Sequence, residues 1–190
     1  MGHLAMVFVA TKFLATRSGL WKSESTMAKK CVSAIGEEIH QSKAFASIEE
    51  ELLVSLLRTT DVLQERFEQA VRPFNISMTQ YNVLRILRGA EPEGRTCSEI
   101  GERMIAREPD VTRLLERMEK AGLIKRSRDK EDRRVVVTRI TSAGLKLLDK
   151  MEPGLGEIGG LLKPIGERRI EKTLKLLDDV RAHVRGDKEE

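Results

Sequence analysis

The feature that most constrains the fold is an apolar stripe followed by a basic, β-branched segment, both within residues 96–141. A helix predicted from about residue 108 to residue 121 carries apolar side chains at a spacing of three and four residues. They share one side of that helix: Val111, Leu114, Leu115 and Met118. Charged residues occupy the other side. Such a helix packs against a core with one face and meets solvent with the other.

The residues after this helix predict a two-stranded hairpin. Gly122 favours a helix end because glycine adopts a left-handed conformation at low cost. Residues 123–126 and the β-branched run 135–140 are typical of paired strands. Residues 127–134 between them are too charged for a core, so we expect a solvated tip. Preceded by a short helix that begins after Thr96, this order predicts a winged helix-turn-helix with the hairpin as the wing, a shape that binds DNA.

The charge distribution supports the same interpretation. The formal net charge of the 190 residues is only +4, so any nucleic-acid contact must depend on a local concentration of Lys and Arg. The hairpin segment of fifteen residues from 125 to 139 contains seven of them: Lys125, Arg126, Arg128, Lys130, Arg133, Arg134 and Arg139. An isolated charged run indicates a solvated surface, but a basic hairpin after an exposed helix indicates a DNA contact.

The composition predicts a mainly helical protein that is not an enzyme. Charged residues make up 34% of the chain and aromatic residues 4%, which is typical of helices rather than a β-sandwich. The histidines are dispersed, and no nucleophile elbow, phosphate loop or metal-ligand spacing occurs. We therefore expect no catalytic residues, cofactor or metal. Cys31 and Cys97 form no disulfide framework, which indicates a cytoplasmic protein, and the apolar run near the N-terminus is too short to span a bilayer.

Amphipathic helices flank the winged-helix segment. Residues 47–75 and 142–186 carry apolar side chains at helical spacing. We expect Pro153 and Gly154 to kink or break the second of these segments, and Pro164 and Gly166 to mark its next joint. Either these stripes cover the back of their own domain or they pair with a second copy, which a two-fold operator favours. The predicted fold is mainly α with a small β-hairpin wing. It comprises a winged helix-turn-helix at 76–141, dimerisation helices at 47–75 and 142–186, and an N-terminal extension at 1–46.

Capping residues predict where the helices begin. Ser47, Ser77 and Thr96 are each followed three residues later by Glu or Gln, and each such pair can satisfy two free amides at a helix start. Thr141 is placed to cap a helix after the hairpin.

Three motifs follow one another in a fixed order. They are TQYNVL at residues 79–84, DVTRLL at 110–115 and DKEDRR at 129–134, with Arg139, Ile140, Thr141 and Gly144 behind the last. Together they resemble the MarR family of bacterial transcriptional regulators over roughly residues 47–185. The resemblance implies an obligate homodimer with interleaved first and last helices. It also implies a repressor that binds a pseudo-palindromic double-stranded DNA operator and is released by a small-molecule effector or an oxidant.

The resemblance and the helix geometry identify candidate DNA contacts. We expect the first turn and a half of the helix at 108–121, the recognition helix, to face the major groove. There Arg113 contacts either guanine, worth roughly 1–3 kcal/mol of discrimination, or phosphate. Many relatives carry Ser before this helix, where residues 107–110 here are Arg-Glu-Pro-Asp. The full candidate set is Arg107, Pro109, Asp110, Thr112, Arg113, Arg117, Arg128, Asp132, Arg133 and Arg134.

At the tip of the wing, Asp132 and Arg134 match the family's Asp-x-Arg element. The resemblance implies that the Asp orients an arginine. The alternative is a surface pair worth ~0–1 kcal/mol. Either Arg133 or Arg134 is expected to enter the minor groove, where narrow A·T tracts attract Arg.

The resemblance also implies an effector crevice between the dimerisation helices and the winged helix. Phe67, Met78, Tyr81 and Arg85 are the candidates to line it, and the alternative is that they belong to the core. Two other interpretations of the chain stay open. One is a winged helix that binds a protein partner and has no operator of its own. The other is a regulator whose redox sensor is Cys31 or Cys97.

Overall fold

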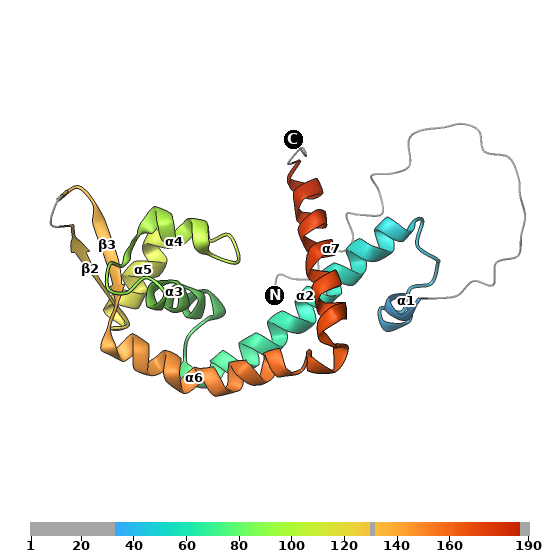
Figure 1. Cartoon of the computed structure of the whole chain (residues 1–190), viewed down its shortest axis with the longest axis horizontal. Coiled ribbons are helices and arrows are strands. Elements are labelled where there is room, and N and C mark those ends of the chain that lie inside the picture. The colour runs from blue at the N-terminus through green and yellow to red at the C-terminus, as the bar shows by residue number, and fades with distance from the viewer. Residues whose placement is uncertain (1–32, 130–131, 187–190) are drawn as a thin grey trace, which may run out of the picture. The chain divides into compact units, whose positions relative to one another are not determined.

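The computed structural model describes residues 33–129 and 132–186 (Figure 1). The chain divides into two compact units, Met1–Val54 and Ser55–Glu190. The helices and strands in chain order are α1 Ala34–Glu38, α2 Ile48–Val71, the 3-10 helix η1 Arg72–Phe74, α3 Met78–Arg88, β1 Arg95–Thr96, α4 Cys97–Arg103, α5 Val111–Lys120, β2 Ile124–Arg128, β3 Val136–Ile140, α6 Ser142–Gly160, the 3-10 helix η2 Lys163–Ile165 and α7 Glu167–Arg185. The predicted class, mainly helical with a small β-wing, is confirmed.

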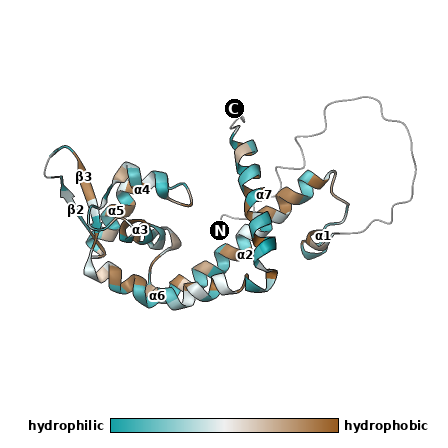
Figure 2. Ribbon diagram, viewed as in Figure 1, coloured by the Kyte–Doolittle hydropathy of each residue, from teal (hydrophilic) through white to brown (hydrophobic). Residues whose placement is uncertain are grey.

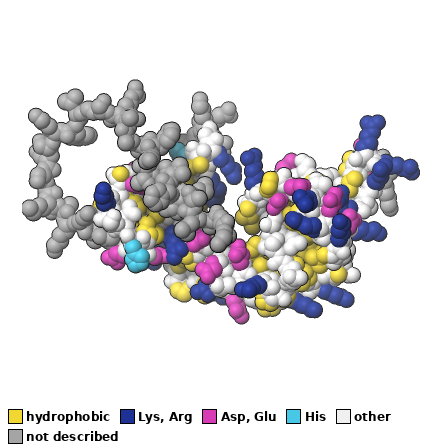
Figure 3. Space-filling model, turned by 180° about the vertical axis from the view of Figure 1, so that it is seen from behind, with side chains coloured by type: hydrophobic (Ala, Val, Ile, Leu, Met, Phe, Trp, Pro, Cys, Tyr) yellow, Lys and Arg dark blue, Asp and Glu magenta, His cyan; other side chains and the backbone are white. Residues whose placement is uncertain are grey.

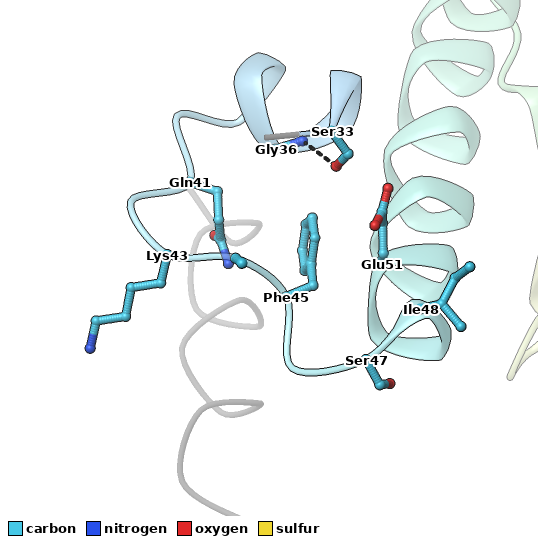
Figure 4. Close-up of a pocket in the computed structure, with 9 residues that line it drawn as sticks. Ser33, Gly36, Gln41, Lys43, Phe45, Ser47, Ile48 and Glu51 are labelled. Carbon is cyan, nitrogen blue, oxygen red and sulfur yellow. Dashed lines mark hydrogen bonds between the residues drawn. The ribbon is translucent and has the colours of Figure 1, made fainter. Parts of the chain in front are cut away.

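The described part of the first unit holds α1 and the beginning of α2. The Ser33 hydroxyl caps α1 by accepting a hydrogen bond from the Gly36 amide at 3.3 Å. An open pocket of about 260 Å³ lies between these two elements. Phe45 points into it, whereas Lys43 points away (Figure 4).

The predicted helix starts at Ser77, Thr96 and Thr141 are confirmed. The Ser77 hydroxyl accepts from the Gln80 amide at 3.2 Å, and the Gln80 side chain accepts from the Ser77 amide at 2.9 Å. Thr96 and Glu99 form the same reciprocal pair. Hydrogen bonds from the Thr96 amide and hydroxyl lower the pKa of Glu99. This contribution to stability is therefore complete above the ordinary carboxyl pKa, and it is lost as the pH falls through the lowered pKa.

The capping box predicted at Ser47 differs in one contact. The Ser47 hydroxyl accepts from the Glu50 amide at 3.2 Å, as predicted. The Glu50 carboxylate, however, accepts from the Ala46 amide at 2.6 Å, one residue earlier than the box requires.

Of the kink or break predicted at Pro153 and Gly154, the break is wrong, because α6 continues through both residues to Gly160. Proline lacks an amide hydrogen and disfavours a helix interior. Here the helix buries apolar side chains on both sides of it, Met151 before and Ile158 after. We infer that this burial offsets the lost hydrogen bond. The next predicted joint is confirmed, since Gly166 has a φ of 85° between η2 and α7.

The wing belongs to an antiparallel sheet with strand order β1-β3-β2 in the described residues. The hairpin pairs Ile124 with Ile140 at one end and Arg128 with Val136 at the other. Residues 127 and 128 are therefore strand residues, although the sequence predicted them in the tip. The two-residue strand β1 was not predicted, and it pairs with β3 through Arg95 and Thr96.

The core of the second unit lies where α3, α4, α5 and α6 meet the hairpin. Fully buried side chains come from each of these elements: Val83, Leu84, Leu87, Ile100, Leu114, Leu115, Met118, Ile124, Leu148 and Met151. Burying an aliphatic side chain of this size stabilises the fold by about 1.5–3 kcal/mol. The predicted apolar stripe of the recognition helix, α5, is thus part of one continuous core.

The junction of the wing with α6 is packed without free space. The Thr141 hydroxyl is 2.7 Å from the Gly122 carbonyl and 3.0 Å from the Leu123 carbonyl, and it accepts from the Gly144 amide at 3.1 Å. A Cβ at Gly144 would lie 2.4 Å from the Leu123 carbonyl oxygen and 2.7 Å from Ile140 Cγ1. The residues that follow α5 are therefore tied directly to the first turn of α6.

Two helices carry apolar side chains that the described residues do not cover (Figure 2). On α2, Leu57 is 73% exposed. On α7, Leu174 is 57% exposed and Val184 is 76% exposed, and none of the residues of this helix is buried. No helix in the described part of the chain has the length and hydropathy needed to cross a membrane.

We predict that Gly144→Ala lowers the free energy of unfolding by about 2 kcal/mol, because the new methyl group overlaps a backbone carbonyl. The control is Gly154→Ala in the same helix, where an added Cβ has nothing within 4 Å. Both substitutions replace a glycine inside a helix by alanine, and helix propensity alone makes that exchange stabilising by about 1 kcal/mol. Urea unfolding followed by circular dichroism measures both. Equal stabilisation by the two substitutions would contradict the tight packing at Gly144.

Candidate nucleic-acid interface

The recognition helix begins later than the sequence predicted. Asp110 has a non-helical backbone, with φ −135° and ψ 70°, and its carboxylate accepts from the Arg113 amide at 2.9 Å. It is therefore the N-cap of α5, which starts at Val111 rather than at residue 108. Pro109 and Asp110 lie before the helix and not on its first turn. Asp110 thus supplies the N-cap, where the family resemblance led us to expect Ser.

The two faces of α5 differ sharply in exposure. Leu114, Leu115 and Met118 are at most 2% exposed. Thr112, Arg113 and Arg117 are exposed on the opposite side, and Arg107 is exposed in the turn before the helix. The candidate major-groove contacts therefore share one solvent-facing surface.

Hydrogen bonds join the described residues at the tip of the wing, 129 and 132–135. The Asp129 amide donates to the Val135 carbonyl at 2.9 Å, and the Val135 amide donates to the Asp132 carbonyl at 3.0 Å. The Asp132 carboxylate accepts from the amide of Arg134 at 2.9 Å. The Asp132 side chain thus fixes the main chain of Arg134, from which the arginine side chain projects.

The arginines of the wing are directed to solvent. Arg128, Arg133 and Arg134 are all exposed. Figure 3 shows Lys and Arg side chains gathered around the hairpin and the adjacent surface of the second unit. Lys130, which the sequence placed in the same basic run, lies outside the described residues.

Two arginines of the basic run have partners inside the domain. The Arg126 amide donates to Glu119 Oε1 at 2.7 Å, and its Nη1 lies 3.8 Å from Glu116 Oε1. Both glutamates belong to α5. Arg139 donates from Nε to the Pro92 carbonyl at 3.1 Å and from Nη1 to the Ser127 hydroxyl at 3.2 Å. Sequence reasoning did not identify these partners, because they join segments that lie up to 47 residues apart.

The turn between α4 and α5 has its own support. Asn82 Oδ1 on α3 accepts from the Ile105 amide at 2.9 Å, and Ile105 itself is 88% exposed. Asn82 lies within the TQYNVL motif, so its position in that motif was the available signal, although its partner was not predicted. This contact fixes the path of the chain between the two helices.

The candidate effector residues divide between core and surface. Tyr81 is buried in the core, and Met78 packs against it. Arg85 is exposed, and its Nη1 donates to the Tyr81 hydroxyl at 3.0 Å, which raises the pKa of Arg85. Phe67 is half-buried on α2. Tyr81 and Arg85 are thus brought together, whereas Met78 is half-buried and packs against the core.

Of the two candidate thiol sensors, Cys97 lies within the described residues. Cys97 is half-buried at the start of α4, with its sulfur 3.6 Å from the Thr112 hydroxyl oxygen on α5. Cys31 lies outside the described residues, so a sensor role for either cysteine stays a prediction. Within residues 33–129 and 132–186, no cluster of His, Cys, Asp or Glu is arranged to hold a metal ion.

Known proteins share this arrangement of sequence and fold. The model of the MarR family matches residues 76–136, which hold the recognition helix and the wing tip. The organic hydroperoxide resistance transcriptional regulator of Bacillus subtilis (strain 168) is 32% identical over 120 residues, covering 63% of this chain and 80% of that protein. The chain belongs to the MarR family.

Solved structures agree with this membership. A MarR transcription factor from Planctomyces limnophilus is 34% identical, with a TM-score of 0.55, and the match covers 71% of this chain and 98% of that one. The transcriptional repressor CouR, solved bound to a 23-mer DNA duplex, shares the fold at 23% identity and a TM-score of 0.63, over 74% of this chain and 99% of that one. This chain is therefore a MarR-family transcriptional regulator with a DNA-binding winged helix, and the family is not enzymatic.

We predict that Asp110→Ala lowers the free energy of unfolding by about 1 kcal/mol, because the Arg113 amide loses its capping acceptor. Asp110→Asn keeps an acceptor oxygen and should stay within a few tenths of a kcal/mol of the parent protein. Chemical unfolding of the three proteins measures the difference. Equal stability of the alanine and asparagine variants would show that the cap contributes nothing.

Proposed function

We propose that this MarR-family regulator is a homodimeric repressor that binds a pseudo-palindromic operator and is released by a small-molecule effector. One observation carries the proposal. The exposed face of α5, with Thr112, Arg113 and Arg117, lies on the same compact domain as a basic wing in which the Asp132 carboxylate holds the amide of Arg134.

The major groove accommodates α5. Its outward side chains can reach base edges while the buried stripe holds the helix against the core. Arg113 is our candidate for a bidentate contact to guanine, and Thr112 for a phosphate or a thymine methyl group. Arg107 and Arg117 flank them and suit phosphate contacts that fix the register. Because its carboxylate caps the helix, Asp110 supports these residues, and Pro109 leads the chain into the cap.

The minor groove is proposed to receive the wing. Arg133 and Arg134 are exposed at the tip, and the Arg134 amide is held by Asp132. A narrow A·T tract concentrates negative potential and attracts an inserted guanidinium. Arg128, on the strand leading to the tip, is placed for a flanking phosphate.

A second copy of the chain is proposed to cover the exposed apolar residues of the terminal helices. The dimerisation helices would lie within residues 47–75 and 142–186. Their association would bury the water-exposed side chains of Leu57, Leu174 and Val184, and this burial would stabilise the homodimer. A two-fold dimer presents two copies of α5 to two half-sites, which a pseudo-palindrome requires. Residues 76–141 would then form the DNA-binding domain.

The proposed effector site includes Arg85. Its guanidinium is exposed and is oriented by the Tyr81 hydroxyl, so it can pair with an acidic group of a small molecule. Phe67 and Met78 are the proposed apolar lining. A ligand releases DNA only if it favours a dimer geometry in which the two recognition helices no longer match successive major grooves, about 34 Å apart.

We predict that selection of bound fragments from random duplex DNA recovers a two-fold motif, and that Arg113→Ala weakens binding to it by about 10- to 100-fold. Loss of a base contact should weaken binding to the selected motif more than it weakens binding to unrelated DNA. Lys150→Ala, which removes an exposed cation on α6, is the matched control and should change affinity by less than about twofold. Salt-sensitive binding without any recovered motif would instead favour a winged helix that binds an acidic protein partner.

We further predict that Leu174→Glu converts the dimer to a monomer at micromolar concentration, because it places a carboxylate in an apolar interface. Light scattering coupled to size-exclusion chromatography measures the mass directly. Lys175→Glu introduces the same charge at the next residue of α7, which is also exposed, and it should leave the dimer intact. A monomeric parent protein would refute the proposed assembly.

A further inference from the structure

The outer face of the wing sheet is covered by the loop that follows α3. Gly94 lies so close to β3 that a Cβ there would be 2.5 Å from the Thr138 carbonyl oxygen and 2.9 Å from Val137 Cγ1. Val137 is consequently only 9% exposed, although it lies on the face of the sheet opposite the core residues Ile124 and Ile140. The loop therefore packs on the sheet.

Arg139 connects this loop with both strands of the hairpin. From β3, its Nε donates to the carbonyl of Pro92 in the loop, and its Nη1 donates to the hydroxyl of Ser127 on β2. The two distances are 3.1 Å and 3.2 Å. A guanidinium holds its donors in a fixed planar fork, so one side chain sets the separation of both partners. The side chain is half-buried between them.

Ser127 is placed where this contact matters most. It lies directly before Arg128, the last residue of β2, and the tip begins at Asp129. The hydrogen bond from Arg139 to Ser127 therefore holds the end of β2, from which the exposed arginines of the tip project. Arg128 points to the other face of the strand and is exposed.

We propose that Arg139, despite its place in the basic run, is a positioning residue that clamps the wing to the loop after α3 and makes no contact with DNA. The inference rests on the proposed function, because its consequence is measured as operator affinity. Without the clamp, the tip samples more orientations, and binding must then order them at a cost in affinity. The number of phosphates that the protein neutralises does not change.

The salt dependence of operator binding separates a clamp from a phosphate contact. Each phosphate contact contributes about 0.9 to the slope of log affinity against log salt. With the full chain and the duplex recovered by selection, we expect Arg139→Lys and Arg139→Gln each to weaken binding roughly fivefold to tenfold with an unchanged slope. Lysine keeps the charge but cannot hold two acceptors in one fork. Ser127→Ala, which leaves the cation in place, should have a smaller effect of the same kind.

Arg128→Gln is the matched neutralisation on the same hairpin. If Arg139→Gln lowered the slope by about one contact, and Arg139→Lys restored both slope and affinity, Arg139 would be a phosphate contact and the clamp would be overturned. Unchanged affinity in both Arg139 variants would overturn it equally.

Hydrogen exchange tests the clamp without DNA. The Asp129 amide, which donates to the Val135 carbonyl, should exchange faster in Arg139→Lys, while amides of the buried α5 stripe keep the parent rate. Unchanged exchange at the hairpin would overturn the clamp whether or not an operator exists. Failure of the parent protein to select any motif would contradict the proposed function alone, and the exchange rates would still decide the role of Arg139.

Discussion

The burial of one face of α5 is the constraint on which the rest of the DNA-binding surface depends. Leu114, Leu115 and Met118 occupy the core, and turning the helix about its axis would expose them at about 1.5–3 kcal/mol each. That burial fixes the rotation of the helix. Thr112 and Arg113 must then face solvent. The packing of the buried side of the helix therefore decides which side chains can contact DNA bases.

Polar contacts extend this fixed orientation to the neighbouring elements. Glu119, near the end of α5, accepts from the Arg126 amide on β2, and Thr141 joins the residues after α5 to the start of α6. The recognition helix and the wing are therefore held in one compact domain. In the proposed homodimer, such a domain leaves the spacing between its two copies as the quantity that an effector would change.

The local elements were the predictable part of the fold. Capping residues and apolar spacing correctly predicted helices that begin after Ser77, Thr96 and Thr141, because these signals depend on residues within about one helical turn of each other. Long-range contacts were not predictable. The pairing of β1 with β3 and the partners of Arg139 join distant segments, and nothing in either segment alone specifies the other.

The candidate site shows the same division. The sequence indicated which residues lie on α5, but it placed the start of the helix three residues too early, at residue 108 instead of Val111. Asp110 was therefore expected in the first turn and not at the N-cap, since Asp suits both positions. In the basic run, residue type did not distinguish Arg139, which has internal partners, from the exposed Arg128. Identical side chains acquire different roles through their tertiary neighbours.

Methylation interference on the selected duplex tests the central claim most directly. Dimethyl sulfate marks guanine N7 in the major groove and adenine N3 in the minor groove, so one experiment reports both contacts. A dimer with α5 in the major groove and the wing in the minor groove predicts two patches of interfering guanines about one helical turn apart, each flanked by interfering adenines. A single patch, or interference confined to one groove, would contradict the account.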